Sequence, residues 1–347
     1  EKPIYNTLNC TGCWKCMDVC KEQAINRINA CPIVIPNEFD MELSKRKAIY
    51  IPYPQAVPLK ATRDLLNCLK ITDAMDCKGC EGVCQADAIL NEDFEITEQL
   101  NVGAVILAPG LSPYDPSNLD TYGFGSLPSV VTSTQFDRML SASGPFGGHL
   151  VKLSDHKAPK KIAWLQCVGS RDNNRCDRAY CSSVCCMYAI KGAMIAKEHA
   201  GNDLECVIFY MDMRTFGKDF DRFRERAQKN YGIRFVRSRI HTIDPVPDSD
   251  ILSFRYTTED GNSKTETFDM AVLSVGLETP PELIDLSRDL GIELTEGNFC
   301  KTSSFSPVTT SRDGVFVCGA FQNPKDISQS VIDAGEAACA AGEALSG

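Results

Sequence analysis

The sequence has 347 residues, a formal net charge of −10 and 18 cysteines. Its length suffices for two or three domains, and its negative charge argues against nucleic acid and anionic membranes as partners. No run of residues reaches the roughly 18 to 20 apolar positions that a membrane-spanning helix needs, so we expect no membrane span.

The cysteines follow metal-ligand spacing rather than a disulfide pattern, which indicates a reducing, cytoplasmic location. Residues 10–20, CTGCWKCMDVC, have the C-x2-C-x2-C-x3-C spacing of bacterial ferredoxins, in which three cysteines bind one [4Fe–4S] cluster and the fourth binds another. Zinc is the competing metal, but zinc sites usually consist of two separated pairs. Residues 68–84 contain a second set, with C-x2-C-x3-C after a longer first interval. We therefore predict a ferredoxin-like domain with two [4Fe–4S] clusters and an ordered linker at residues 1–98.

The ligands of these two clusters are predicted from the exchange of fourth cysteines between the halves of a ferredoxin. The eighth ligand has two candidates. Cys20 has the ferredoxin spacing but is followed by a lysine. Cys31 lacks that spacing but is followed by a proline, the usual neighbour of a fourth cysteine. We expect one cluster on Cys10, Cys13, Cys16 and Cys84, and the other on Cys68, Cys77, Cys80 and either Cys20 or Cys31.

Residues 102–111, VGAVILAPGL, are predicted to form a fully apolar strand that ends at Gly110. Residues 270–277, MAVLSVGL, repeat this design. Such strands resemble those that close the nucleotide-binding domains of two-domain flavin reductases, although any buried parallel strand has a similar pattern. Residues 113–150 are rich in proline and glycine and predict a crossover with one helix, at about residues 133–141.

Residues 161–191 combine a strand, a turn and a helix with several cysteines. In a dinucleotide-binding domain, this order of elements carries a glycine-rich phosphate loop, but here only Gly169 remains. Thiolates beside a helix N-terminus are favoured by the helix dipole, as a phosphate would be. We interpret this stretch as a nucleotide site rebuilt as an iron–sulfur site, with a group of buried free cysteines as the alternative. The cysteines concerned are Cys167, Cys181, Cys185 and Cys186.

The pattern continues with a strand at residues 206–211, a charged helix at 220–229 and a strand at 233–236. A hairpin is expected to turn at Asp260-Gly261 before the closing strand. This order predicts a Rossmann-like α/β domain at residues 157–278.

The C-terminal stretch predicts a strand that ends at Gly319-Ala320, followed by a helix of small residues that starts near Ile327. Flavoprotein reductases end in this way, with the glycine against the FAD pyrophosphate and the helix N-terminus facing the flavin. An alanine-rich packing helix is the alternative. We predict a partial FAD-binding domain from residues 99–156 and 279–347, with the following FAD-binding residues: Gly110, Gly319, Ala320, Asp326 and Ile327.

Several stretches together resemble the family of the iron–sulfur flavoprotein subunit of heterodisulfide reductase, and the resemblance covers nearly the whole chain. They are CPIVIPNEFD, RKAIYIPYPQAVP, SASGPFGGH, QCVGSRD, YCSSVCCMYAIK, FYMDMRTFGKDF and GVFVCGAFQNPKDI. The resemblance implies a thioredoxin-reductase-like fold of FAD/NAD-type Rossmann domains, with an inserted ferredoxin domain. It also implies that Cys167, Cys181, Cys185 and Cys186 hold a third [4Fe–4S] cluster near the flavin. Lys191 is then expected to be partly buried near the flavin ring, with Asp137 as its acidic partner.

The resemblance further implies an oxidoreductase subunit that transfers electrons through FAD and three [4Fe–4S] clusters, without a catalytic nucleophile. It would take an electron pair from a hydrogenase or formate dehydrogenase module. One electron would go to ferredoxin and one to a subunit that reduces the CoM-S-S-CoB disulfide. Other heterodisulfide reductase-type subunits are expected as partners in a multi-subunit complex, which could be dimeric. The alternatives are a non-bifurcating relative in a quinone-linked, sulfur-metabolising or acyl-CoA-reducing complex, and a scaffold subunit that carries only clusters.

The sequence departs from the family pattern in three places. The stretch from Cys20 to Cys31 resembles an insertion, and one extra residue lies between Cys167 and Cys181. The N-terminal βαβ unit of the FAD domain, with its G-x-G-x-x-G, is absent from the sequence. We therefore expect either that the sequence is a fragment or that a second chain supplies this half.

Overall fold

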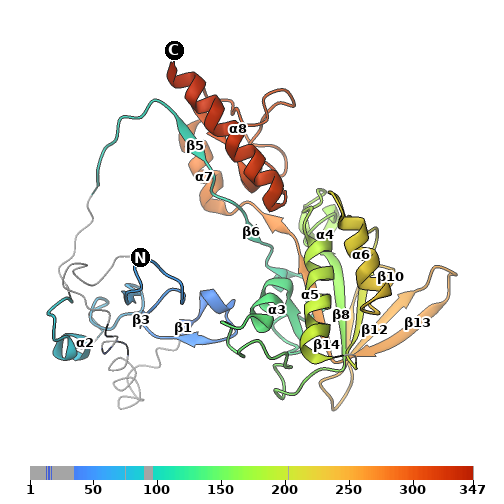
Figure 1. Cartoon of the computed structure of the whole chain (residues 1–347). Coiled ribbons are helices and arrows are strands. Elements are labelled where there is room, and N and C mark those ends of the chain that lie inside the picture. Colours follow the sequence, from blue (N-terminus) through green and yellow to red (C-terminus); the bar gives the residue numbers. More distant parts are fainter. Residues whose placement is uncertain are drawn as a thin grey trace. The chain divides into compact units, whose positions relative to one another are not determined.

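The computed structural model describes residues 13, 15, 17, 35–74, 76–89, 97–201 and 203–346. The chain divides into two compact units, each of which is described by itself (Figure 1). The first consists of Glu1–Gln99 with Ser141–Gly147, and the second of Leu100–Leu140 with Gly148–Gly347. The predicted ligands Cys10, Cys16, Cys20 and Cys31 lie outside the described residues.

The first unit consists of short elements around a small core. Cys80 packs there with Ile49 and Ala61, and Met17 and Ile89 pack against them. The unit contains two antiparallel strand pairs, β1 with β2 and β3 with β4. The described elements are β1 (Ile35–Pro36), η1 (Glu38–Asp40), β2 (Lys45–Arg46), β3 (Ile49–Tyr50), β4 (Thr62–Arg63) and α2 (Gly79–Val83).

The second unit is built on a parallel sheet in the order β10-β9-β8-β14-β7. The apolar runs of β8 and β14 are buried along almost their whole length, as central parallel strands require. The predicted strands at residues 206–211, 233–236 and 270–277 are confirmed, but the predicted range 157–278 omits β7. The sheet strands are β7 (Val130–Thr132), β8 (Lys161–Val168), β9 (Glu205–Tyr210), β10 (Arg234–Arg237) and β14 (Met270–Val275).

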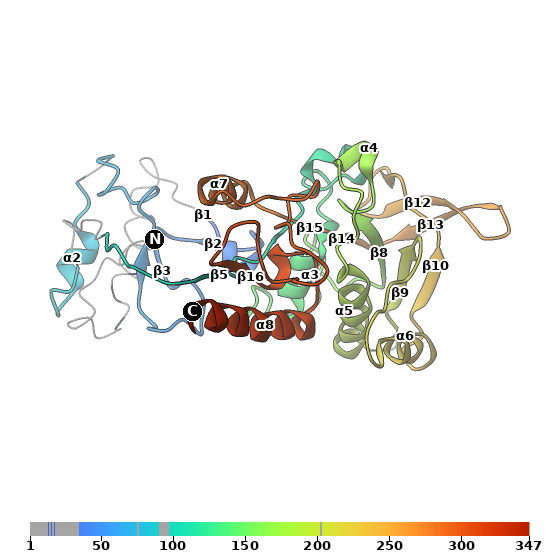
Figure 2. The same cartoon turned by 90° about the horizontal axis from the view of Figure 1, so that it is seen from above.

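Helices α3 (Ser133–Leu140), α5 (Cys185–Ala200) and α6 (Phe220–Lys229) lie together on one face of this sheet (Figure 2). Alternate residues of β8 point to opposite faces, and Trp164 contacts Phe136 of α3 edge to face at 5.3 Å. The other face carries an aromatic core formed with a small antiparallel sheet. That sheet contains β11 (Ile243–Pro245), β12 (Leu252–Thr257) and β13 (Ser263–Phe268), which confirms the predicted hairpin.

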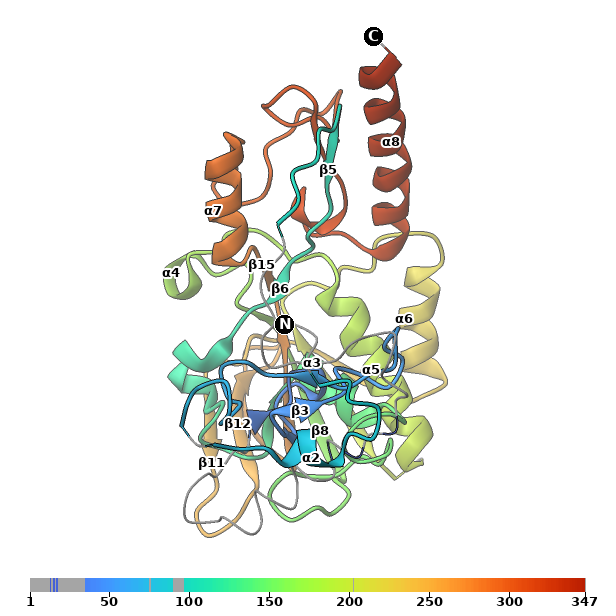
Figure 3. The ribbon, with the colours of Figure 1, turned by 90° about the vertical axis from the view of Figure 1, so that its left-hand side faces the viewer.

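The C-terminal part of the second unit is a layer of two helices and two parallel strands, β5 (Val105–Leu107) and β16 (Val315–Val317). α7 (Pro281–Leu290) and α8 (Ile327–Ser346) flank β5 on either side (Figure 3). The apolar stretch at residues 102–111 therefore forms only a three-residue strand. It is not fully buried, because the side chain of Ile106 is 42% exposed.

None of the helices in the described part of the chain is long and apolar enough to cross a membrane.

Short elements complete the second unit. β6 pairs with β15 antiparallel, next to the end of β14. The remaining bounds are β6 (Ser112–Pro113), η2 (Pro116–Asn118), η3 (Asp120–Tyr122), α4 (Asn173–Cys176), β15 (Leu277–Glu278) and η4 (Gly319–Phe321).

Candidate functional site

The loop between β8 and α5 brings together the four cysteines predicted for the third cluster. Cys167 lies near the end of β8, and Cys185 and Cys186 are the first two residues of α5. All three are buried, whereas Cys181, in the loop before the helix, is half-buried. The hollow that they share is lined by Cys167, Ser170, Arg171, Cys181, Ser182, Ser183, Cys185, Cys186, Asp212 and Arg214.

The backbone around this hollow is unusual. Cys167, Arg171 and Ser183 have φ values of 64°, 55° and 67°, in the left-handed region that non-glycine residues rarely adopt. The loop is fixed in this conformation by the Ser170 and Ser182 hydroxyls, which are 2.8 Å apart. Ser182 Oγ also accepts a hydrogen bond from the backbone of Leu277 at 2.9 Å. Strained backbone that is held by its surroundings is typical of functional sites.

The four thiols are an appropriate donor set for an iron–sulfur cluster, because all four line one hollow. Burial raises the pKa of Cys186 to about 11, against a smaller opposing effect of a hydrogen bond from the Arg214 backbone. Burial and the neighbouring thiols also raise the pKa of Cys185. Both thiols are therefore protonated at neutral pH without a metal, and cluster binding must displace their protons.

A single metal ion needs ligands that converge more closely. Across the described ranges, no group of three or more His, Cys, Asp or Glu side chains is arranged to hold one ion. A [4Fe–4S] cluster is larger than a single ion, and the four cysteines line a shared hollow.

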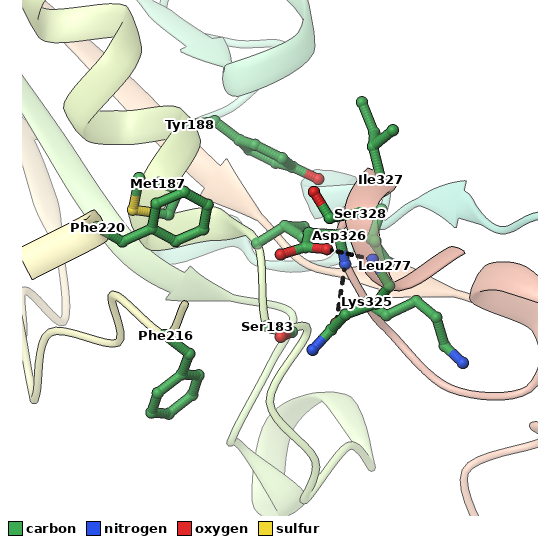
Figure 4. A pocket seen from close by; sticks show the side chains of 12 residues that line it. Ser183, Met187, Tyr188, Phe216, Phe220, Leu277, Lys325, Asp326, Ile327 and Ser328 are labelled. Atoms are coloured by element: carbon green, nitrogen blue, oxygen red, sulfur yellow. Dashed lines mark hydrogen bonds between the residues drawn. The ribbon is translucent and has the colours of Figure 1, made fainter. Parts of the chain in front are cut away.

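A larger cavity of about 380 Å³ lies beside the N-termini of α5 and α8 (Figure 4). Its volume is within the range of roughly 300 to 1,000 Å³ typical of ligand sites. Met187, Tyr188 and Phe220 approach it from one side, and the segment that begins α8 approaches it from the other. The lining residues are Ser183, Val184, Met187, Tyr188, Phe216, Phe220, Leu277, Lys325, Asp326, Ile327, Ser328 and Gln329.

The beginning of α8 is ordered by reciprocal capping. Asp326 Oδ1 accepts a hydrogen bond from Gln329 N at 2.8 Å, and Asp326 N donates to Gln329 Oε1 at 3.2 Å. Asp326 and Ile327, both predicted as FAD-binding residues, thus line the cavity. The predicted residues Gly319 and Ala320 lie in η4 directly after β16, and Gly110 follows β5. These three residues stand at the carboxyl ends of two paired strands, outside the cavity wall.

Sequence reasoning missed the lysine that lies in the cavity wall. The side chain of Lys325 is only 7% exposed, and its Nζ donates to Gln322 Oε1 at 2.6 Å and to Asp333. The available signal was its position directly before the capping residue of a helix that was expected to face a flavin.

Lys191 differs from the prediction. Its side chain is 58% exposed, so the expectation of partial burial is wrong. Its Nζ lies 3.3 Å from Asp137 Oδ1, and the two residues form an ion pair between α5 and α3. Lys191 follows Met187 and Tyr188 by one helical turn, which places it next to the cavity rather than in its wall. Its proposed role at a flavin stays a prediction.

In the first unit, the structure describes five of the predicted cluster ligands. Cys68 and Cys80 are buried, Cys77 and Cys84 are half-buried, and Cys13 is exposed. Burial raises the pKa of Cys80, and the nearby thiols of Cys68 and Cys77 raise it further, so these three side chains lie close together. The assignment of ligands to two clusters stays a prediction.

The turn that carries Cys68 is held by a charge network centred on the buried side chain of Arg46. Arg46 pairs with Glu38 at 2.5 Å and with Asp64 at 3.1 Å, and its guanidinium stacks on Tyr50. The backbone carbonyl of Asp64 in turn accepts a hydrogen bond from Cys68 N at 3.0 Å. The stretch between the two cysteine sets therefore contributes to the position of one predicted ligand.

Part of the second unit matches a known class of oxidoreductase. A family model described as "Pyridine nucleotide-disulphide oxidoreductase" matches residues 193–342, which supports the predicted FAD/NAD-type Rossmann fold. A solved thioredoxin reductase from T. acidophilum is 16% identical with a TM-score of 0.45, over 70% of this chain and 66% of that one.

The chain belongs to the family of the iron–sulfur flavoprotein subunit of heterodisulfide reductase, as the resemblance predicted. A CoB--CoM heterodisulfide reductase iron-sulfur subunit from Methanopyrus kandleri is 43% identical over 99% of this chain and 50% of its own length. The corresponding subunit of the H(2):CoB-CoM heterodisulfide,ferredoxin reductase from Methanothermobacter thermautotrophicus is 38% identical over 98% of this chain and 49% of its own length. The chain thus spans about half the length of the curated relatives it matches.

Proposed function

We propose that this chain is an FAD- and [4Fe–4S]-containing electron-transfer subunit of a heterodisulfide reductase-type complex. The observation that carries the proposal is the shared wall of the two sites. Ser183 lines both the four-cysteine hollow and the 380 Å³ cavity. Cys185 and Cys186 lie in the hollow, and Met187 and Tyr188, the next two residues of α5, line the cavity. Two redox groups in these sites would be near neighbours.

The proposed ligands of the third cluster are Cys167, Cys181, Cys185 and Cys186, and the proposed position of the flavin is the cavity. When bound, FAD would exchange electron pairs and the clusters single electrons. The chain's own residues bind and orient these groups. Met187, Tyr188 and Phe220 exclude water from the flavin side, and the N-terminus of α8 favours an anion there. Two further clusters are proposed in the ferredoxin-like part.

The proposed partners follow from the names of the relatives. The subunit would accept an electron pair from a hydrogenase or formate dehydrogenase module. It would pass one electron to ferredoxin and one to a subunit that reduces the CoM-S-S-CoB disulfide. A non-bifurcating relative and a cluster-only scaffold remain the alternatives, and the flavin cavity favours a flavoprotein over the scaffold.

The small β5–β16 sheet supports a further proposal, that another segment completes the FAD domain. Parallel strands normally lie within larger, covered sheets, but in the described part of the chain β5 and β16 form a parallel sheet of two strands, and Leu100, Val102 and Ile106 are exposed. We propose that a βαβ unit with the G-x-G-x-x-G loop pairs with this sheet. It could belong to the same polypeptide or to a second chain.

The proposal is tested by analysis of the anaerobically purified protein together with its partner subunits. We expect a flavin absorption spectrum and about twelve irons per chain, four for each of three clusters. A protein with eight or fewer irons and stoichiometric zinc would contradict the cluster assignment. A protein with its full iron content but without flavin would favour the scaffold alternative.

Lys325 and Lys191 form a matched pair of variants for the position of the flavin. A cation beside the ring stabilises reduced, anionic flavin, so Lys325→Met is expected to lower the flavin midpoint potential. At a fixed applied potential, the ratio of reduced to oxidised flavin should fall by about tenfold. Lys191→Met should lower the midpoint potential less, because this cation is 58% exposed and is screened by solvent. Spectroelectrochemical titration of both variants checks this. An unchanged potential in Lys325→Met would place the ring elsewhere.

A further inference from the structure

The four-cysteine hollow has a charged wall that its cysteines do not explain. Arg171 follows β8, whereas Asp212 and Arg214 follow β9, and all three line the hollow. β8 and β9 are adjacent parallel strands, so their carboxyl ends meet at the same edge of the sheet. The topology therefore delivers these three side chains to the place where the strands end and the cysteines begin.

The wall carries a net positive charge. Arg171 Nη1 pairs with one oxygen of Asp212, and Arg214 Nη2 lies 3.5 Å from the other. Burial raises the pKa of Asp212, but the bond from Arg171 and the charges of both arginines outweigh it and lower the pKa below its ordinary value. Asp212 is thus ionised, and arginine stays protonated in proteins. Within the described residues, no other carboxylate pairs with either guanidinium, so two positive charges face one negative charge.

These charges are positioned to act on the hollow rather than on solvent alone. The side chains of Arg171 and Arg214 are 23% and 32% exposed. Arg171 interacts electrostatically with Cys167 and Cys181, and the backbone of Arg214 forms a hydrogen bond towards Cys186. An ordinary surface ion pair would be largely screened by water and salt. Here the Arg171 cation lies near two of the four thiols, and the backbone of Arg214 lies against a third.

We infer that Arg171 and Arg214 raise the reduction potential of the cluster proposed on Cys167, Cys181, Cys185 and Cys186. The inference rests on the proposed function. A [4Fe–4S] cluster with four thiolate ligands is an anion, and its reduction adds one electron without breaking a bond. A fixed cation nearby stabilises the more negative, reduced form more than the oxidised form. Net charge near the cluster and hydrogen bonds to its sulfurs are known determinants of such potentials.

The inference concerns the driving force for electron transfer from a flavin to this cluster. A cluster with a raised potential accepts an electron from a neighbouring flavin more readily than one in an uncharged wall. Asp212 orients both guanidinium groups and offsets part of their charge.

The test is an EPR-monitored redox titration of the complete anaerobic complex with Arg171→Gln, Arg214→Gln or both. The signal of this cluster is identified as the one missing from a Cys181→Ala protein. Each single variant should reduce the ratio of reduced to oxidised cluster at a fixed potential by about threefold to tenfold, where tenfold corresponds to 59 mV for one electron. Arg171→Lys keeps the charge and should restore most of the wild-type potential.

Arg288→Gln is the matched control, because it removes an exposed, ion-paired arginine from α7. It should leave the potential unchanged. A cluster that is present in both glutamine variants with an unaltered potential would overturn the inference and leave the proposed function intact. Loss of the cluster from both variants would also overturn it, since the arginines would then be structural. Absence of this cluster from the wild-type protein would overturn the proposed function and the inference together.

Discussion

Replacement of both Cys185 and Cys186 by alanine is expected to remove about four irons from the chain while the flavin is retained. The two thiols are buried at the start of α5, and together they provide half of the four-cysteine hollow. Two remaining cysteines cannot hold a cubane that needs four ligands. The flavin should remain, because neither cysteine lines the cavity.

Iron analysis and EPR spectroscopy of the anaerobic protein check this expectation. Cys206→Ala is the control, because Cys206 is a fully buried cysteine on β9 that does not line the hollow. It removes a buried thiol of the same kind and should leave the iron content unchanged. Wild-type iron in the double variant would show that the hollow does not hold a cluster.

Gly169→Ala is expected to destabilise the second unit by about 2 to 5 kcal/mol. Gly169 has a φ of 70°, which costs an alanine about 1 to 2 kcal/mol. An added Cβ would also lie 2.0 Å from Cδ1 of Tyr114, and such overpacking costs about 1 to 3 kcal/mol more. Tyr114 has little room to move, because it is buried and Arg178 stacks on its ring.

Thermal unfolding followed by circular dichroism under anaerobic conditions measures this effect. Gly261→Ala separates the two contributions. Gly261 also has a left-handed φ, of 83°, but an added Cβ there meets nothing within 4 Å. It should cost only the conformational part. Equal destabilisation by the two variants would mean that the contact with Tyr114 is relieved without cost.

Elements with a strong local pattern could be predicted from the sequence. The helix at residues 220–229 was predicted with the bounds of α6, and the hairpin turns at Gly261 as expected. β7 was missed because it is only three residues long and its pairing with β14 joins residues far apart in the chain. The length of the strand predicted at residues 102–111 was overestimated, because apolar composition does not reveal where strand pairing stops.

In the candidate site, too, features with a local sequence pattern could be predicted, and features that depend on distant residues could not. The spacing of the cysteines around α5 could be read directly, because cluster ligands follow a pattern along the chain. The charged wall could not, since Arg171 and Asp212 are 41 positions apart and meet only through the adjacent ends of β8 and β9. The exposure of Lys191 and the burial of Lys325 likewise depend on neighbours from other elements.

The loop between Cys167 and Cys181 is closed at its base by backbone hydrogen bonds. Arg171 N donates to Tyr180 O at 2.9 Å, and Asp172 N donates to Arg178 O at 2.8 Å. The residues between these bonds, including α4, form an excursion. Its length does not affect the positions of the two ends of the loop, because the hydrogen bonds hold them together. This excursion can therefore be lengthened or shortened without moving either cysteine. The first two turns of α5 have no such freedom, because each inserted residue would rotate the helix by about 100° and turn the cavity wall away from the hollow.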